Sequence, residues 1–172
     1  MPVHYMSFQY PLLVTAHQDR FLHIWNLEEN FQSNNWNPKD LCESPLKFAT
    51  TSIGVFGNGK GYVIGSIEGR CGVQNYDLTK RDLGKAYDFC FKCHREENKA
   101  QMTADVYSVN GLCFNQKYNT FASYGSDGMF TIWNKDTKSK YKSSKKFPAP
   151  ITSAAFSDDA TLLAYAVGYD WA

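Results

Sequence analysis

One pattern occurs three times along the chain: a short polar turn with an acidic residue at its third position, followed at once by a short strand-like segment. The copies read HQDRFLHIW at 17–25, SIEGRCGVQ at 66–74 and GSDGMFTIW at 125–133, and a partial fourth, VGYDWA, stands at 167–172. The acids are Asp19, Glu68, Asp127 and Asp170. Such self-similarity indicates a fold built from one repeated structural unit.

Two further apolar segments precede each polar turn, which makes the unit predominantly β. The nearer segments are LLVTA, GYVIG, TFASY and LLAYA, and the farther ones are VHYMSF, TSIGVF, SVNGLCF and ITSAAF. Turn-forming clusters such as Gly57-Asn58-Gly59 separate them. An outer strand is expected at 46–49, at 87–93 and at 139–145. Since no segment has a sustained helical period with caps, we expect an all-β chain of four-stranded units.

The third strand of two units ends in a tripeptide typical of WD-repeat propeller blades. These are Ile24-Trp25-Asn26 and Ile132-Trp133-Asn134. In such blades a short carboxylate accepts hydrogen bonds from turn N–H groups. We therefore expect Asp19, Asp127 and Asp170, and by position also Glu68, to be structural residues of the blade turns and not catalytic acids.

The repeat predicts one partial WD40-repeat β-propeller domain over 1–172. Its blades are expected at approximately 1–49, 50–95, 106–147 and 150–172, with polar surface insertions at 28–45 and 95–105. That is about three and a half blades, whereas propellers usually close with 4–8. Half a propeller leaves apolar blade faces open, which predicts either a truncated molecule or self-association.

The string CFKCH at 90–94 has the spacing of a c-type haem attachment site. Side chains alternate along a strand, so Cys93 is expected to face one way and Cys90, Lys92 and His94 the other. Cysteines on opposite faces cannot jointly bind haem or zinc, or bond each other, without breaking the strand. We expect packed thiols, with no metal and no cofactor.

Composition narrows the function classes. The net charge of +1 argues against whole-chain electrostatic binding of nucleic acid. No secretory signal or membrane-spanning apolar run is visible, and five cysteines without a signal suggest reduced thiols. Nucleophile-elbow, Walker and paired-carboxylate motifs are absent from the sequence, so we expect a binding protein and not an enzyme, with no small-molecule substrate and no membrane partner.

Longer strings resemble one family. Phe-Lys-Cys-His-Arg at 91–95 and Gly-Ser-Ile-Glu-Gly-Arg at 65–70 carry the resemblance, with further matches at 43–47, 107–111, 125–128 and 168–171. Together they closely resemble the C-terminal half of the Rae/Gle mRNA export factors, WD-repeat propellers of the nuclear pore. Bub-type mitotic-checkpoint propellers share the first two strings, but the ending Tyr169-Asp170-Trp171 favours the export branch.

The resemblance implies a nucleoporin partner. Family members bind a short acidic segment, the Gle-binding sequence, of a Phe-Gly nucleoporin, through an arginine matching Arg70 and a basic residue matching Lys92, with Glu68 beside them. A guanidinium offers carboxylates a planar fork, which suits this role. The alternative for Arg70 is a solvated turn arginine. The alternative function is a spindle-checkpoint propeller that binds similar segments of checkpoint kinases.

The resemblance also implies single-stranded RNA binding near Phe91, Trp133, Lys135 and Lys138. The run KDTKSKYKSSKK at 135–146, which includes Lys140 and Lys142, supports this independently, because it holds six lysines and one aspartate. The alternatives are a solvated outer strand whose lysines protect an edge, and a packed Trp133.

Two family positions differ in this chain. Asn134 stands where aspartate is frequent, and Lys138 stands where arginine is common and loses the bidentate fork. The resemblance places the protein in the nucleus, at the nuclear envelope and pore complex, with shuttling to the cytoplasm.

Overall fold

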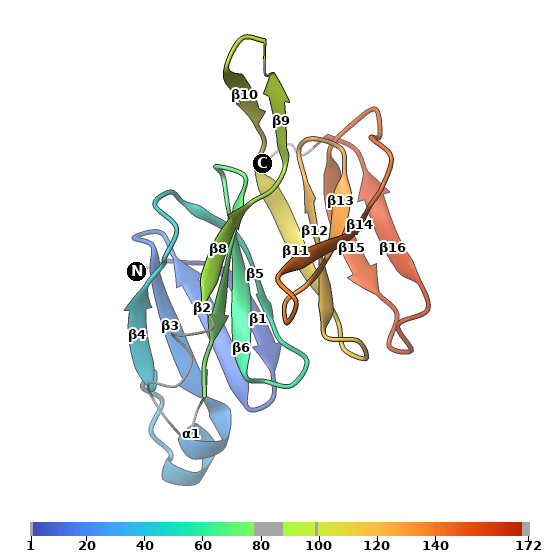
Figure 1. Ribbon diagram of the computed structural model, residues 1–172. Coiled ribbons are helices and arrows are strands. Elements are labelled where there is room, and N and C mark those ends of the chain that lie inside the picture. Colours follow the sequence, from blue (N-terminus) through green and yellow to red (C-terminus); the bar gives the residue numbers. More distant parts are fainter. Residues whose placement is uncertain (1, 78–87, 99, 170–172) are drawn as a thin grey trace.

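The structure is a computed structural model that describes residues 2–77, 88–98 and 100–169. Its described part contains three four-stranded antiparallel sheets and two two-stranded hairpins, joined in chain order (Figure 1). The predicted fold class, an incomplete all-β WD40 propeller of about three and a half blades, is confirmed. Asp170 lies outside the described residues.

Each complete sheet is a meander in which consecutive strands pair. Sheet one consists of β1 (Val3–Gln9), β2 (Leu12–His17), β3 (Phe21–Asn26) and β4 (Asp40–Glu43). Sheet two consists of β5 (Thr50–Val55), β6 (Gly61–Ser66), β7 (Arg70–Asn75) and β8 (Phe89–Lys92). Sheet three consists of β11 (Val109–Asn115), β12 (Thr120–Gly125), β13 (Phe130–Asn134) and β14 (Ser139–Ser143).

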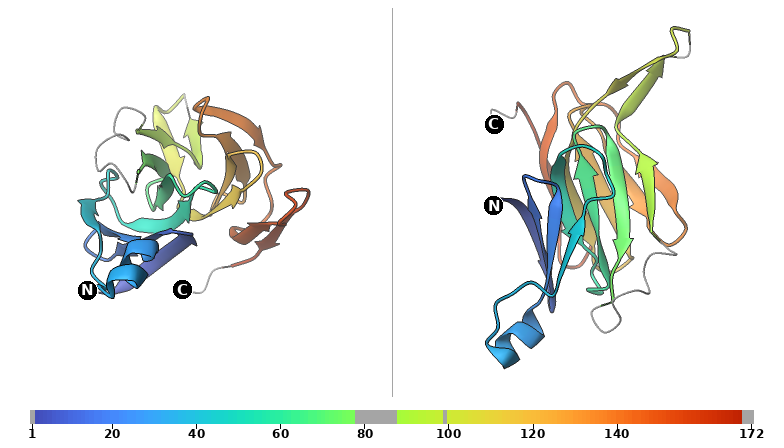
Figure 2. Two further views of the ribbon diagram at one scale, coloured as in Figure 1. Left: turned by 90° about the horizontal axis from the view of Figure 1, so that it is seen from below. Right: turned by 90° about the vertical axis from the view of Figure 1, so that its left-hand side faces the viewer.

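Two hairpins complete the described strands. The C-terminal hairpin, β15 (Ile151–Phe156) and β16 (Leu163–Val167), follows sheet three. The hairpin of β9 (Arg95–Asn98) and β10 (Thr103–Val106) occupies the polar insertion at 95–105 and projects from the end of the molecule (Figure 1). The first strands β1, β5, β11 and β15 are neighbours in turn, so the sheets follow an arc around a common centre (Figure 2).

The core lies between successive sheets. Sheets one and two enclose one apolar cluster, which includes Val14, Ile24, Leu46 and Ile64. Sheets two and three enclose a second, with Val73, Val109 and Phe121 among its members. Successive side chains of β6 point to opposite faces of sheet two, so this strand contributes Ile64 to the first cluster and Val63 to the second.

Two local expectations are wrong. The outer strand of sheet one is β4 at Asp40–Glu43 and not 46–49, because Leu46 leaves the sheet edge and is buried between sheets one and two. The insertion at 28–45 also contains a helix, α1 (Leu27–Ser33), although no helix was expected. Asn26 caps its start, accepting from the backbone N–H of Glu29, but two turns are too short to display a helical period.

The chain leaves each complete sheet in the same way. The backbone N–H groups of Ser44, Cys93 and Phe147 donate to the carbonyl oxygens of Arg20, Gly69 and Gly128 in the polar turns, at 2.9, 3.0 and 2.9 Å. All three turn residues have positive φ, at 68°, 60° and 72°. The residue after each donor (Pro45, His94 and Pro148) therefore occupies an equivalent place, directed toward the next sheet.

Candidate partner-binding surface

His94 joins a buried hydrogen-bond network in sheet three. Its Nδ1 lies 2.8 and 2.9 Å from the two carboxylate oxygens of Asp127, and its Nε2 lies 2.9 Å from Ser123 Oγ. The Trp133 indole N–H donates to the same Ser123 oxygen at 2.8 Å. A ring nitrogen facing a carboxylate carries the hydrogen, so Nε2 accepts from the Ser123 hydroxyl. We call these four residues the His94 network.

The expected direction of His94 is therefore wrong. Strand β8 ends at Lys92, and His94, with φ of 47°, turns inward and is buried, whereas Cys90 and Lys92 are exposed. Gly125 makes room for the ring, because a Cβ there would lie 2.8 Å from Nδ1. Asp127 also accepts from the Met129 N–H at 3.1 Å. The histidine of CFKCH thus connects sheet two to the turn of sheet three.

The acid of sheet two has a different environment. Pro45 holds the place equivalent to His94, and a proline has no side-chain donor for the Glu68 carboxylate. Glu68 Oε2 instead lies 3.4 Å from Arg70 Nε, and the two side chains are 19% and 34% exposed. The Arg95 guanidinium stabilises the same turn by donating to the backbone carbonyl oxygens of Glu68 and Gly69, at 2.6 and 3.3 Å. Sequence reasoning gave Arg95 no role.

Arg70 and Lys92 lie side by side at the edge of sheet two. They are direct partners in the β7–β8 register, and within the described strands β8 pairs with β7 alone. Directly opposed residues place their Cβ atoms about 5 Å apart. The Glu68 carboxylate lies beside the Arg70 member of this pair. The arrangement can accept a further carboxylate from a partner.

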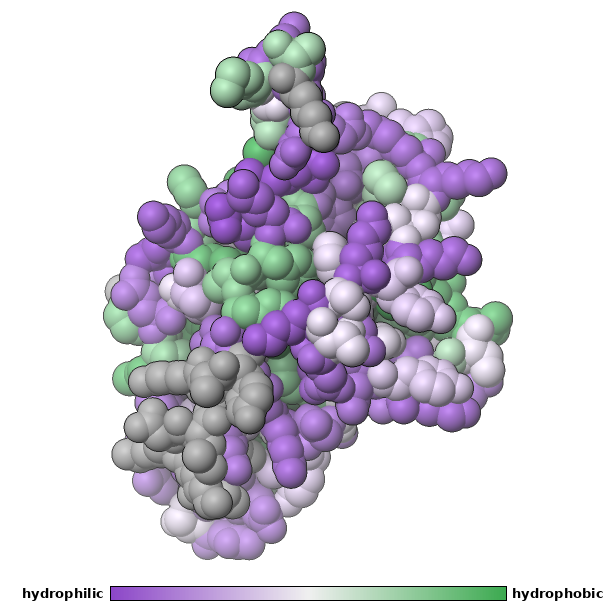
Figure 3. Space-filling model, in the orientation of Figure 1, coloured by the Kyte–Doolittle hydropathy of each residue, from purple (hydrophilic) through white to green (hydrophobic). Residues whose placement is uncertain are grey.

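Aromatic rings connect this edge to sheet three. The Phe91 ring lies 4.6 Å from the Trp133 ring and 5.9 Å from the Phe89 ring. Lys138 Nζ lies 4.9 Å from the centre of the Phe89 ring. A small hollow of about 110 Å³ is lined by Phe89, Phe91, Lys92, Phe121, Trp133, Asn134, Lys138 and Ser139. Apolar side chains gather over β8, and hydrophilic ones extend from the region of β13 and β14 (Figure 3).

The structure separates the residues expected at an RNA surface into two groups. Trp133 is packed between sheets three and two, donating to Ser123 of its own sheet and contacting Phe91 of β8. Lys135 is also engaged, since its ammonium donates to Asp136 and lies 5.0 Å from the Phe56 ring, leaving the side chain 10% exposed. Lys138, Lys140 and Lys142 are exposed on or next to β14, with Tyr141 between the last two.

No family model matches the chain, but curated proteins do. It is 40% identical over 169 residues to the poly(A)+ RNA export protein of Schizosaccharomyces pombe, and 39% identical over 166 residues to protein RAE1 of Arabidopsis thaliana. These matches cover 98% and 96% of this chain. The mRNA export factor rae-1 of Caenorhabditis elegans is 36% identical over 168 residues, covering 94% of the chain.

The chain is a homologue of the Rae1/Gle2 mRNA export factors. The resemblance expected from the sequence is thereby confirmed. The homologue spans about half the length of the curated relatives it matches, covering 45%, 43% and 42% of the three relatives named above. A WD40 repeat protein, poxJ of Penicillium oxalicum, is 40% identical over 169 residues and agrees with the fold.

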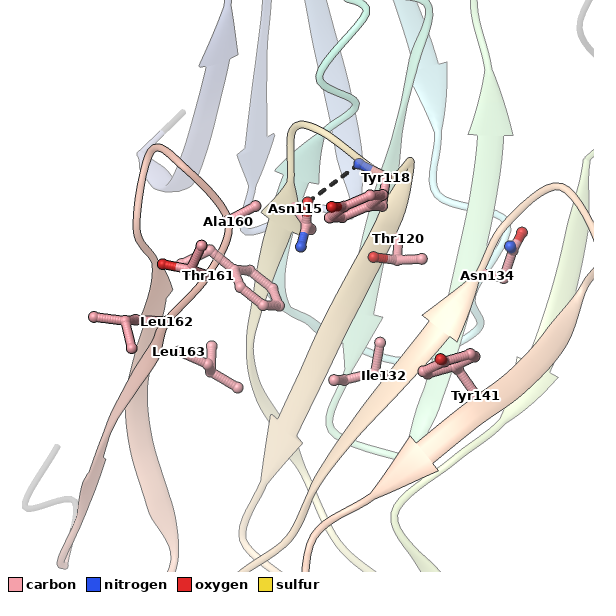
Figure 4. Close-up of a pocket in the computed structure, with 11 residues that line it drawn as sticks. Asn115, Tyr118, Thr120, Ile132, Asn134, Tyr141, Ala160, Thr161, Leu162 and Leu163 are labelled. Atoms are coloured by element: carbon pink, nitrogen blue, oxygen red, sulfur yellow. Dashed lines mark hydrogen bonds between the residues drawn. The ribbon is translucent and has the colours of Figure 1, made fainter.

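A cavity lies between sheet three and the C-terminal hairpin of this Rae1/Gle2 homologue. It measures about 600 Å³ and is lined by side chains such as Tyr118, Ile132, Tyr141 and Leu163 (Figure 4). In the described residues β16 has no third strand beside it, unlike β2, β6 and β12. The lining holds no carboxylate, imidazole or thiol.

The cysteines of CFKCH have separate environments, as strand alternation predicts. Cys90 is exposed, whereas Cys93 is buried with its Sγ 3.5 Å from Cys71 Sγ. Among the described residues, no group of three histidine, cysteine or acidic side chains could hold a metal ion. Over the same residues, no helix is long and apolar enough to cross a membrane.

Proposed function

We propose that this chain is a non-catalytic WD-repeat scaffold of nuclear mRNA export. It binds the acidic Gle-binding sequence of a Phe-Gly nucleoporin and single-stranded RNA, and it acts at the nuclear pore complex while shuttling to the cytoplasm. Its homology to mRNA export factors supports this proposal.

The observation that carries the peptide proposal is the pair of cations at the open edge of sheet two. Arg70 and Lys92 are opposed across β7 and β8, and the carboxylate that faces Arg70 lies at 3.4 Å, a loose ion pair. An incoming glutamate can displace Glu68 from the guanidinium and form a shorter, charge-assisted contact. A desolvated pair of this kind anchors an interface.

The test is fluorescence anisotropy of a labelled Gle-binding-sequence peptide. We expect saturable binding to the unmodified chain and a loss of at least about 100-fold in Arg70→Glu, because the substitution replaces attraction by repulsion. Lys60→Glu, at the opposite end of sheet two, makes the same charge change and should bind normally. Equal affinities of the Arg70 and Lys60 variants, or no saturable binding by the unmodified chain, would refute the site.

A matched peptide separates the two family branches. A segment of a checkpoint kinase, labelled in the same way, serves as competitor. We expect the nucleoporin peptide to displace the kinase peptide at a lower concentration than the kinase peptide needs to displace the nucleoporin peptide. The reverse order of affinities would favour the checkpoint branch.

For RNA, the exposed lysines of β14 support the proposal better than Trp133 or Lys135 does. Lys138, Lys140 and Lys142 are solvent-accessible, and the exposed Tyr141 lies within their run. Replacing the three lysines by alanine should lower the salt dependence of RNA binding by about 2 in log–log slope, since each lost phosphate contact contributes about 0.7. An unchanged slope would place the RNA elsewhere.

A further inference from the structure

Two buried thiols lie in contact behind the Arg70–Lys92 edge. Cys71 Sγ and Cys93 Sγ are 3.5 Å apart, and the residues are 0% and 6% exposed. Both belong to the apolar cluster between sheets two and three, together with Val73, Val109 and Phe121. The two thiols are therefore packed against each other inside this core.

The backbone explains the contact. Cys71 follows Arg70 in β7 and is opposed to Phe91, so residue 93 lies on the same face, one step along the diagonal. Strand β8 ends at Lys92, and the Cys93 N–H turns to donate to the Gly69 carbonyl at 3.0 Å. This bend carries the Cys93 side chain over β7. Cys90, in contrast, faces outward from β8.

We propose that Cys71 and Cys93 form an oxidation-sensitive dithiol that hydrogen peroxide converts into a disulfide. A disulfide needs an S–S distance of about 2.05 Å, so the sulfurs must approach by roughly 1.5 Å. Side-chain rotation together with a small shift of the chain end after β8 can supply this movement. The modification would join β7 to the segment that carries His94.

The atoms balance with peroxide as the oxidant. Cys93, the more exposed of the two, reacts as its thiolate: the sulfur takes one peroxide oxygen, the O–O bond breaks and hydroxide leaves to become water. The Cys71 sulfur then attacks the sulfenic acid, the S–S bond forms, and the S–O bond breaks with release of a second water. Two thiols and one peroxide thus give one disulfide and two waters.

The fold makes this reaction slow and selective. Burial raises the pKa of the Cys71 thiol well above its ordinary value, so little thiolate exists in the closed structure. Strand β8 is a four-residue outermost strand, and such strands open locally at low cost. We therefore expect oxidation when this edge opens briefly. Cys93 should then pair with Cys71, because the Cys71 sulfur lies nearest to it.

Trypsin digestion distinguishes the possible linkages, because it places Cys71, Cys90 and Cys93 on three different peptides. Cleavage after Arg70, Lys80, Lys92 and Arg95 yields CGVQNYDLTK with Cys71 and CHR with Cys93, whereas Cys90 stays with the peptide ending at Lys92. The folded chain is treated with hydrogen peroxide, alkylated, digested without reductant and analysed by mass spectrometry. We expect CGVQNYDLTK linked to CHR, at two hydrogens below the summed mass, roughly tenfold above any other linkage.

Two variants sharpen the result. In Cys71→Val, which keeps an apolar side chain in the core, the linkage should vanish and Cys93 should be captured by dimedone as the sulfenic acid. Cys90→Ser should form the linkage as the unmodified chain does. Circular dichroism checks that both variants fold. The proposal is overturned if peroxide that fully oxidises Cys90 leaves Cys71 and Cys93 unlinked, or if Cys90 is the main linked partner of either.

Discussion

The turns of sheets two and three share one backbone arrangement, but their acidic side chains differ in burial and in partner. In both, a positive-φ glycine accepts a hydrogen bond from the departing chain. In sheet three, the acid Asp127 is buried and paired with His94. In sheet two, the place of that histidine is taken by Pro45, and Glu68 pairs loosely with Arg70 at the surface. The residue that precedes each sheet, His94 or Pro45, therefore differs in whether it can donate a hydrogen bond to the acid of the turn.

Sheet one shows a third version of the same turn. The Trp25 indole N–H donates to Thr15 Oγ1 at 3.5 Å, and Thr15 contacts His17 Nε2 at 3.1 Å. The ring of His17 lies 3.9 Å from the ring of His23. Within the described residues, the buried Nδ1 of His17 has no hydrogen-bond partner. His17 of sheet one therefore makes the hydroxyl contact that His94 makes in sheet three, but it lacks the contact to a carboxylate.

The largest effect is expected from Asp127→Ala. The substitution leaves the His94 Nδ1–H and the Met129 N–H without their acceptor in a buried site, which should cost about 3 kcal/mol of unfolding free energy. For a chain of this size the melting temperature should fall by about 10 °C. Thermal and urea unfolding measure both. A loss below about 1 kcal/mol would show that the His94 network is not a major stabilising feature.

A smaller effect on stability is expected in sheet one, where the contribution of His23 should depend on pH. Burial, and then the charge of His17, lowers the pKa of His23. The unfolded chain therefore takes up more protons than the folded chain once the pH falls below the ordinary histidine pKa of about 6.5. Stability contributed by His23 is present above that pH and is lost as the pH falls toward the lowered pKa.

The measurement is the urea midpoint of the unmodified chain and of His23→Gln at pH 7.5 and 5.5. The variant should lose less stability between the two values. His4→Gln, which changes an exposed histidine on β1, is the control and should retain the full loss. Equal pH dependence in all three chains would contradict the role of His23.

The smallest stability effect is expected from Glu68→Ala. The ion pair that it removes is partly exposed, and such pairs contribute between 0 and about 1 kcal/mol. Peptide affinity should instead rise by about threefold, because the acid that competes for Arg70 is gone. Anisotropy and thermal unfolding on the same sample separate the two properties. A stability loss equal to that of Asp127→Ala would erase the difference between the two turns.

Much of the fold follows from local pattern. Alternating apolar strands and Asp-containing turns recur within each unit, so the four-stranded sheets could be predicted. The misplaced outer strand of sheet one has a physical cause: Leu46 is apolar because it is buried in a connection, and periodicity cannot distinguish that burial from a strand. Helix α1 depends on the Asn26 cap and on too few residues to show a period.

The site was less predictable because its contacts are distant in sequence. The Arg70–Lys92 neighbourhood could be expected from family strings, but His94 meets Asp127 across 33 residues. Strand alternation assigned His94 to the wrong face because the strand ends at Lys92. Lys135 was expected to be available for RNA, but it lies over Phe56, which comes from another sheet. No local pattern encodes these pairings.

His94 also couples the stabilities of two sheets. The residue that completes the turn of sheet three is supplied by the chain that leaves sheet two, so the full stability of sheet three depends on an intact outer edge of sheet two. Each sheet then behaves as a unit coupled to its nearest neighbour, as in linear repeat proteins. Loosening β8 should therefore raise amide exchange in β12 and β13 before it does so in β2 and β3.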